Sequence, residues 1–252
     1  MATGSDIVAR AMRHEGVTDF FYIMGAPMMG VEKACMKLGL RGIDVRHEQA
    51  AGHMADAYSR VTGKTGVVLV TSGPGATNTV TPIATAYMDS IPMVILSGQV
   101  ASHLIGEDAF QETDMVGISR PIVKHSFQVR HASEIPAIIK KAFYIAASGR
   151  PGPVVVDIPK DATNPAEKFA YEYPEKVKMR SYQPPSRGHS GQIRKAIDEL
   201  ITAKRPMIYT GGGVVQGNAS ALLTELAHLL GYPVTNTLMG LGAFPGNDPQ
   251  FV

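Results

Sequence analysis

The sequence lacks the features that mark several large classes of protein. It has a single cysteine, Cys35, which excludes an internal disulfide and fits a reducing, cytoplasmic compartment. Lysine and arginine number 24 against 22 aspartates and glutamates, and they form no basic run that would indicate a nucleic-acid partner. No apolar stretch approaches the roughly 20 residues of a membrane helix, and the N-terminus lacks the basic start and apolar core of a secretion signal. These absences favour a cytoplasmic globular enzyme.

The sequence contains instead short apolar runs that alternate with amphipathic stretches. Its 252 residues, 44% of them hydrophobic, can bury a substantial core. The alternation is typical of βαβ units, so we expect an α/β fold with a doubly wound, six-stranded parallel sheet. The expected strands are residues 20–23, 43–46, 66–70, 93–96, 126–129 and 153–158. The main helices are expected at residues 5–16, 31–38, 49–62, 76–88 and 133–147.

Prolines suggest where the first domain ends. Residues 1–161 hold the six expected strands, whereas residues 162–187 contain four prolines, many charges and no periodicity, as a linker does. Residues 188–252 then begin a second α/β domain, with strands expected near 206–209 and 234–235. Because two strands cannot close a second doubly wound sheet, we expect this domain to be incomplete.

The candidate site lies where expected strands pass into helices. Glu48 stands at such a point, and in open parallel sheets ligands bind at the carboxyl ends of the strands. Taken alone, Glu48 need only complement the positive end of a helix dipole. Gly73 and Gly75 flank Pro74 after the clearest buried strand, where glycine lets the backbone approach a ligand closely. This turn matches neither common nucleotide motif, GxGxxG or GxxxxGK[ST].

Three acids crowd the expected loop at residues 105–114. Glu107, Asp108 and Glu112 could suggest a metal site, but the segment lacks the alternating carboxylate and amide ligands of a calcium loop. A solvated loop is therefore the favoured interpretation, and no metal ligands are assigned in this chain.

Five stretches together resemble one family in its order and spacing. They are residues 46–49 (RHEQ), 71–78 (TSGPGATN), 86–92 (AYMDSIP), 108–114 (DAFQETD) and 149–154 (GRPGPV). They closely resemble the catalytic subunits of the acetolactate synthase family, which are thiamine-diphosphate-dependent carboligases. The resemblance runs from about residue 5 to the end of the chain, and it implies that residues 1–161 form the pyrimidine-binding domain and residues 188–252 the first part of a central Rossmann-like domain.

The resemblance also implies roles for individual residues. Glu48 matches the catalytic glutamate that hydrogen-bonds N1′ of the aminopyrimidine and so activates the cofactor. The residues that match the segments around the pyrimidine are Gly25, Ala26, Pro27, Ser72, Gly73, Pro74 and Asn78. The substrate side is matched by Phe110, Gln111 and Lys160, of which the last two are catalytic candidates. The positions that hold FAD in flavin-containing members are matched by Arg150, Gly211, Gly212, Gly213, Thr237, Leu238 and Met239.

Several of these residues also have a simpler structural explanation. A lone Gln111 or Lys160 is ordinarily solvated surface, and Gly211 to Gly213 need be no more than a strand-to-helix turn. The chain also departs from the family at Met28 and Met29, where the family usually has two glycines, and bulky methionines there leave the substrate open.

The family's Mg²⁺ ligands and diphosphate site belong to a third domain, and no matching segment occurs here. The chain is therefore expected to hold half a site and to be inactive alone. It would be a fragment of a longer enzyme or a subunit of a split one, completed by a second copy in a homo-oligomer or by a partner chain.

The expected reaction is decarboxylation of pyruvate and addition of the hydroxyethyl unit to a second 2-oxo acid, as in branched-chain amino-acid biosynthesis. The alternatives are a 2-oxo-acid decarboxylase, a sulfoacetaldehyde acetyltransferase, a non-catalytic subunit, or an unrelated doubly wound domain with a nucleotide. The leading hypothesis requires the Glu48 side chain to lie against the turn at residues 72–78.

Overall fold

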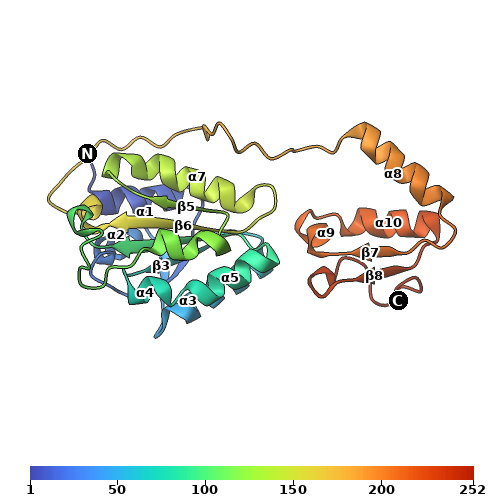
Figure 1. The fold of residues 1–252 in the computed structure, drawn as a ribbon, viewed down its shortest axis with the longest axis horizontal. Coiled ribbons are helices and arrows are strands. Elements are labelled where there is room, and N and C mark those ends of the chain that lie inside the picture. Colours follow the sequence, from blue (N-terminus) through green and yellow to red (C-terminus); the bar gives the residue numbers. More distant parts are fainter. The chain divides into compact units, whose positions relative to one another are not determined.

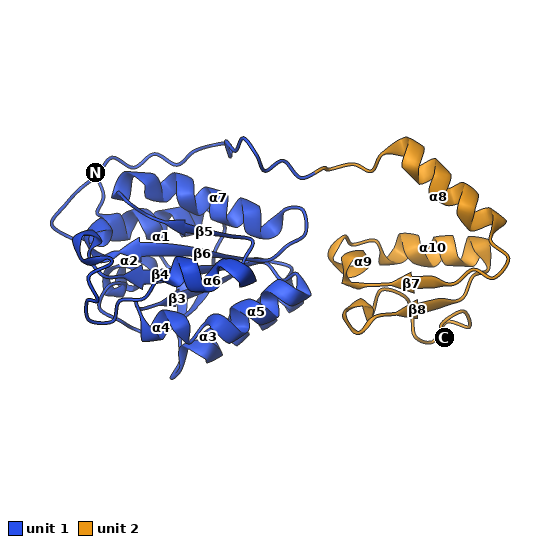
Figure 2. Cartoon of the chain, in the orientation of Figure 1, with its two compact units in different colours: residues 1–184 blue, residues 185–252 orange.

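The computed structural model describes residues 1 to 252, whose helices and strands are labelled in Figure 1. They form two compact units, Met1–Pro184 and Pro185–Val252 (Figure 2). None of the helices combines the length and the apolar character needed to cross a bilayer.

A six-stranded sheet forms the centre of the first unit. All neighbouring strands run parallel, in the order β2-β1-β3-β4-β6-β5, which confirms the predicted α/β class and strand number. The strands are β1 (Asp19–Tyr22), β2 (Arg41–Asp44), β3 (Gly66–Val70), β4 (Met93–Gln99), β5 (His125–Gln128) and β6 (Pro153–Pro159). The chain passes from β1 outward to β2 and returns to the other side of β1 as β3, so the winding direction reverses between β1 and β3.

Helices cover both faces of this sheet, because successive strand residues point to opposite faces and both are apolar. In β3, Val67 and Leu69 belong to one buried cluster and Val68 and Val70 to the other. The first cluster is covered by α1 (Gly4–His14), α2 (Met29–Lys37) and α7 (Ile135–Ala147). The second is covered by α3 (Glu48–Thr62), α5 (Val80–Asp89) and α6 (Met115–Ser119) (Figure 2). The short helices of this unit are α4 (Pro74–Thr77), η1 (Ser102–Leu104), η2 (Arg120–Ile122), η3 (Ala132–Glu134) and η4 (Lys160–Thr163).

Two predicted elements differ from the structure. The second strand lies at Arg41–Asp44, not at residues 43–46, because Arg41 pairs with Asp19 in the ladder and forms an ion pair with it at 2.5 Å. The helix predicted at residues 76–88 is divided into α4 and α5. Pro82 has no N–H and would clash with a helical carbonyl four residues earlier, so the helix restarts at Val80 and Pro82 falls in its first turn.

Residues 165–184 form neither helix nor strand, yet they pack on the first unit. Phe169 forms an antiparallel bridge with Ala2, and Tyr171, Tyr173 and Tyr182 lie against the apolar cluster of α1 and α7. The Tyr173 hydroxyl donates to Glu15 at 2.5 Å. Aromatic contacts therefore hold the greater part of the proline-rich segment on the first unit, and the division between units falls after Pro184.

The second unit has a two-stranded parallel sheet and three α-helices. Ala227, Val234 and Phe244 form its cluster of buried apolar residues. Its elements are α8 (Ser190–Thr202), β7 (Ile208–Thr210), α9 (Gly212–Gln216), α10 (Ser220–Leu230), β8 (Val234–Asn236) and η5 (Leu238–Gly240).

Candidate functional site

Three segments meet at the carboxyl edge of the sheet, beside the point where the winding reverses. They follow β1 (residues 24–27), β2 (residues 45–48) and β3 (residues 71–75). Parallel strands bring these segments to one edge, and the reversal leaves a space between the two diverging connections. The topology therefore places the predicted site residues of the first three strands together.

Glu48 is the first residue of α3, where its negative charge complements the positive end of the helix dipole. The preceding residue, His47, caps the helix through Nδ1, which accepts the Gln49 N–H at 3.1 Å. The half-buried Glu48 carboxylate accepts the Asn78 side-chain amide at 2.8 Å through Oε2, whereas Oε1 accepts no hydrogen bond from the protein. Glu48 therefore lies against the turn at residues 72–78 with one oxygen available to a ligand.

Glycines are required where these segments touch. A Cβ on Gly75 would lie 2.5 Å from Thr71 Cγ2 and 3.1 Å from Glu48 Oε1. A Cβ on Gly25 would lie 2.2 Å from Thr71 Cβ. Thr71 is thus wedged between two glycines, a role that no pattern in the sequence indicates. A side chain at Gly75 would crowd the Glu48 carboxylate, and one at Gly25 would displace Thr71.

Gly73 has a second reason to be glycine. Its φ of 55° is in the left-handed range, and a Cβ there would lie 2.4 Å from the carbonyl oxygen of Gln111. The loop that carries Phe110 and Gln111 therefore lies directly on the β3 turn. Phe110 itself is 88% exposed, which is unusual for a large aromatic side chain. Within the turn, Ser72 is buried and Pro74 is exposed.

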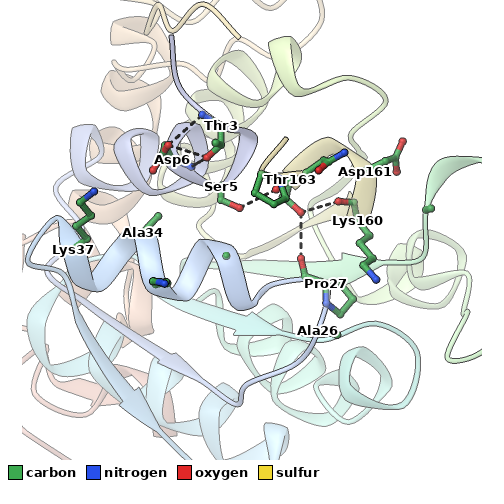
Figure 3. Close-up of a pocket in the computed structure, with 15 residues that line it drawn as sticks. Thr3, Ser5, Asp6, Ala26, Pro27, Ala34, Lys37, Lys160, Asp161 and Thr163 are labelled. Atoms are coloured by element: carbon green, nitrogen blue, oxygen red, sulfur yellow. Dashed lines mark hydrogen bonds between the residues drawn. The ribbon is translucent and has the colours of Figure 1, made fainter. Parts of the chain in front are cut away.

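A cavity of about 710 Å³ lies beside this cluster, between α1, α2 and η4 (Figure 3). Ala26, Pro27 and Lys160 line it, so the structure brings these three predicted residues together. The Thr163 hydroxyl lies 3.3 Å from the Pro27 carbonyl oxygen and 3.0 Å from that of Lys160, which links the turn to η4. Glu48 does not line this cavity. The turn after β1 thus separates the predicted cofactor carboxylate from the lysine-lined cavity.

Two buried acids lie close to the site without belonging to its predicted residues. Burial raises the pKa of Asp157, on β6, to about 7, against the lowering effect of its hydrogen bond from Gln99. Burial likewise raises the pKa of Glu32 to about 7, although the Gly25 N–H donates to it. One oxygen of each carboxyl group has no partner. Neither acid was predicted, because nothing in the sequence marks an isolated acid in a strand or helix as buried.

Arg150 lies away from the other first-unit residues. It precedes β6, at the amino end of the sheet, and its guanidinium donates to Ser90 Oγ at 2.7 Å and to the Met88 carbonyl at 3.2 Å. It therefore closes the end of α5 and does not contact the Glu48 cluster.

The predicted second-unit residues lie together. Gly211 follows β7, and Thr237 follows β8 and caps η5 by accepting the Gly240 N–H at 3.1 Å. A Cβ on Gly212 would lie 3.1 Å from the Met239 carbonyl oxygen, so the glycine turn and residues 237–239 are adjacent. Gly213 is exposed at the first turn of α9, and Leu238 is 82% exposed.

The first-unit cluster fits the pyrimidine end of a thiamine cofactor. A carboxylate with one unengaged oxygen beside a tight glycine turn can accept or share a proton with a ring nitrogen. No group of three or more His, Cys, Asp or Glu side chains is placed to bind a metal ion.

Comparison with known proteins agrees with this geometry. The family described as "Thiamine pyrophosphate enzyme, N-terminal TPP binding domain" matches residues 2–118, and the "central domain" of the same enzymes matches residues 193–252. The chain is 57% identical over 251 residues to the acetolactate synthase large subunit of Haemophilus influenzae. It is 56% identical over 253 residues to the isozyme 3 large subunit of Escherichia coli, and 48% identical over 249 residues to acetolactate synthase of Mycobacterium bovis. These alignments cover 98 to 99% of the chain but 40 to 44% of each relative.

Proposed function

The chain belongs to the thiamine pyrophosphate enzyme family and is similar throughout to the N-terminal part of acetolactate synthase large subunits, and from this premise we propose that it supplies the pyrimidine-binding half of a carboligase active site. The reaction is condensation of a pyruvate-derived hydroxyethyl unit with a second 2-oxo acid. One observation carries the proposal: Glu48 Oε1 is unengaged and faces a glycine-lined turn, while Oε2 is fixed by Asn78.

When bound, thiamine diphosphate supplies a thiazolium carbon that becomes nucleophilic on losing its proton. Glu48 holds the proton at the pyrimidine nitrogen, and this requires a carboxylate in a site with little water, where its interaction with the ring is strong. Asn78 orients the carboxylate, and Gly75 allows the β3 turn to lie against it without a side chain in between.

The substrate side is formed by Phe110, Gln111 and Lys160. The exposed Lys160 ammonium attracts the carboxylate of a 2-oxo acid, and the exposed Phe110 ring offers an apolar surface to its methyl or ethyl group. Phe110 and Gln111 are neighbours on the loop at residues 105–114, and Lys160 is the first residue of η4, so the shape of this side depends on that loop.

The remaining cofactors and partners belong to the same proposal. FAD would lie along Gly211 to Gly213 and residues 237–239, which are adjacent in the second unit. Mg²⁺ and the diphosphate would be held by protein that a second copy or a partner chain supplies.

The decisive test is exchange of the cofactor C2 proton in the assembled enzyme with thiamine diphosphate and Mg²⁺. Glu48→Gln should slow this exchange by about 10²-fold or more, because the amide cannot take up the proton. Glu167→Gln, at an exposed acid outside the site, is the matched control. Equal exchange rates in the wild type and Glu48→Gln would remove Glu48 from the mechanism. With pyruvate added, acetolactate as product supports the carboligase, and acetaldehyde alone supports a decarboxylase.

A further inference from the structure

The loop that carries Gln111 has an unusual backbone. Gln111 and Asp108 have φ values of 59° and 54°, in the left-handed range that residues with a side chain rarely adopt. Such conformations persist only where surrounding interactions impose them, and they concentrate at functional sites. Some feature of this loop must therefore hold Gln111 in place.

The carboxylate of Glu112 is that feature. One of its oxygens accepts the Gly106 N–H and the other accepts the Ala109 N–H at 2.9 Å, so a single side chain joins both arms of the loop. The Glu112 N–H also donates to the Ala109 carbonyl at 2.9 Å. These backbone donors hold the pKa of the Glu112 carboxyl below its usual value, as expected for an ionised acceptor.

The other end of the loop is fixed to the sheet. Gln99, on β4, donates to the Thr113 carbonyl at 2.8 Å and to the buried Asp157 carboxyl at 3.0 Å. Gln111 directly precedes Glu112 and this anchor, and its carbonyl lies against Gly73. The acid that the sequence favours as solvated is therefore engaged inside the loop.

We propose that Glu112 is a positioning residue for the reaction, because its carboxylate holds Gln111 and Phe110 over the β3 turn on the substrate side of the site. This inference rests on the proposed function for its catalytic consequence, but its structural part does not. Glutamine cannot replace Glu112, because both carboxylate oxygens accept hydrogen bonds and an amide has one acceptor oxygen.

The test compares Glu112→Gln with Glu107→Gln. Both remove one negative charge from the same loop, but no hydrogen bond is made by the Glu107 side chain, which is exposed. Amide hydrogen exchange on the full chain should show exchange at Gly106 and Ala109 faster by about 10-fold or more in Glu112→Gln, and within about 2-fold of wild type in Glu107→Gln. Circular dichroism should show that both variants remain folded, since the loop lies outside the two cores.

The catalytic part is tested in the assembled enzyme. In Glu112→Gln, kcat/KM for pyruvate should fall by about 10- to 100-fold, as expected for a misplaced substrate contact, while C2 proton exchange stays at the wild-type rate. Equal kcat/KM in the two variants would overturn the positioning role. Slower C2 exchange in Glu112→Gln would also overturn it, because the loss would then extend to the Glu48 side of the site. Absence of C2 exchange in the wild type would instead refute the proposed function, whatever the loop amides show.

Discussion

Replacing Asp157 by asparagine should change how the stability of the first unit depends on pH. Asp157 is 1% exposed on β6, between β4 and β5, where Gln99 and Gln128 donate to one of its oxygens at 3.0 and 3.2 Å. Burial is the main cause of its raised pKa, and the charge of Asp114 adds to it. Asparagine has nearly the same shape as aspartate and cannot ionise, so the substitution isolates the cost of burying the carboxylate charge.

The magnitude follows from the size of the shift. A rise in the pKa of Asp157 from 3.8 to about 7 corresponds to about 4 kcal/mol, since each pKa unit is worth about 1.36 kcal/mol. Because the folded-state pKa exceeds the unfolded one, the stabilising contribution of protonated Asp157 is fully present below about pH 4 and is lost as the pH rises through about 7. The Asp157→Asn variant does not lose stability in this way, because asparagine stays neutral at every pH. The free energy of unfolding of the variant minus that of the wild type should therefore rise by about 4 kcal/mol between pH 4 and pH 8.

Urea unfolding at several pH values measures this difference. The contributions of Glu32 and of the other titrating groups are common to both proteins, so they cancel. Hydrogen exchange at the amides of Val155 and Val156, which precede the acid in β6, reports the first unit alone. A difference that stays constant within about 1 kcal/mol across the range would show that Asp157 is not held in its neutral form, and it would refute the inference from burial.

Three further changes test the packing around the site. Ile139→Ala removes a fully buried side chain of α7 and should lower the free energy of unfolding by about 2–5 kcal/mol in urea, without altering C2 exchange. Gly73→Ala should cost about 1–2 kcal/mol for its left-handed backbone alone and should also displace Gln111, so both stability and kcat/KM should fall. Tyr173→Phe removes the hydrogen bond to Glu15, so it should cost about 1 kcal/mol and speed protease cleavage within residues 165–184.

The parts of the fold that the sequence predicted are those that local patterns determine. The run at Gly66–Val70 is apolar at every position, as a strand covered on both faces must be, and all five residues are buried. Parallel order then follows from the alternation with helices, and it brings the ends of β1, β2 and β3 together. The contact of Glu48 with the turn at residues 72–78 could be anticipated because it depends on topology more than on side-chain detail.

Other features depend on contacts between distant segments. Tyr171 and Tyr173 occur in a charged, proline-rich stretch whose composition is that of a linker, and only their packing on α1 and α7 attaches that stretch to the first unit. Asp157 follows three valines in a strand, and whether such an acid is buried depends on the glutamines that neighbouring strands supply. Composition describes a whole segment and does not indicate which of its residues contact distant parts of the chain.

The loop at residues 105–114 shows why the proposed substrate side is harder to predict than the proposed cofactor side. Gly73 alone indicates a tight turn, Glu112 alone indicates a solvated acid, and Gln111 alone indicates polar surface. In the structure the three depend on one another: Gln111 can occupy its left-handed conformation because Glu112 binds the loop amides, and its carbonyl can approach the sheet because residue 73 has no side chain. A sequence shows the local preference of each residue, whereas the contact between this loop and the β3 turn depends on all three residues at once.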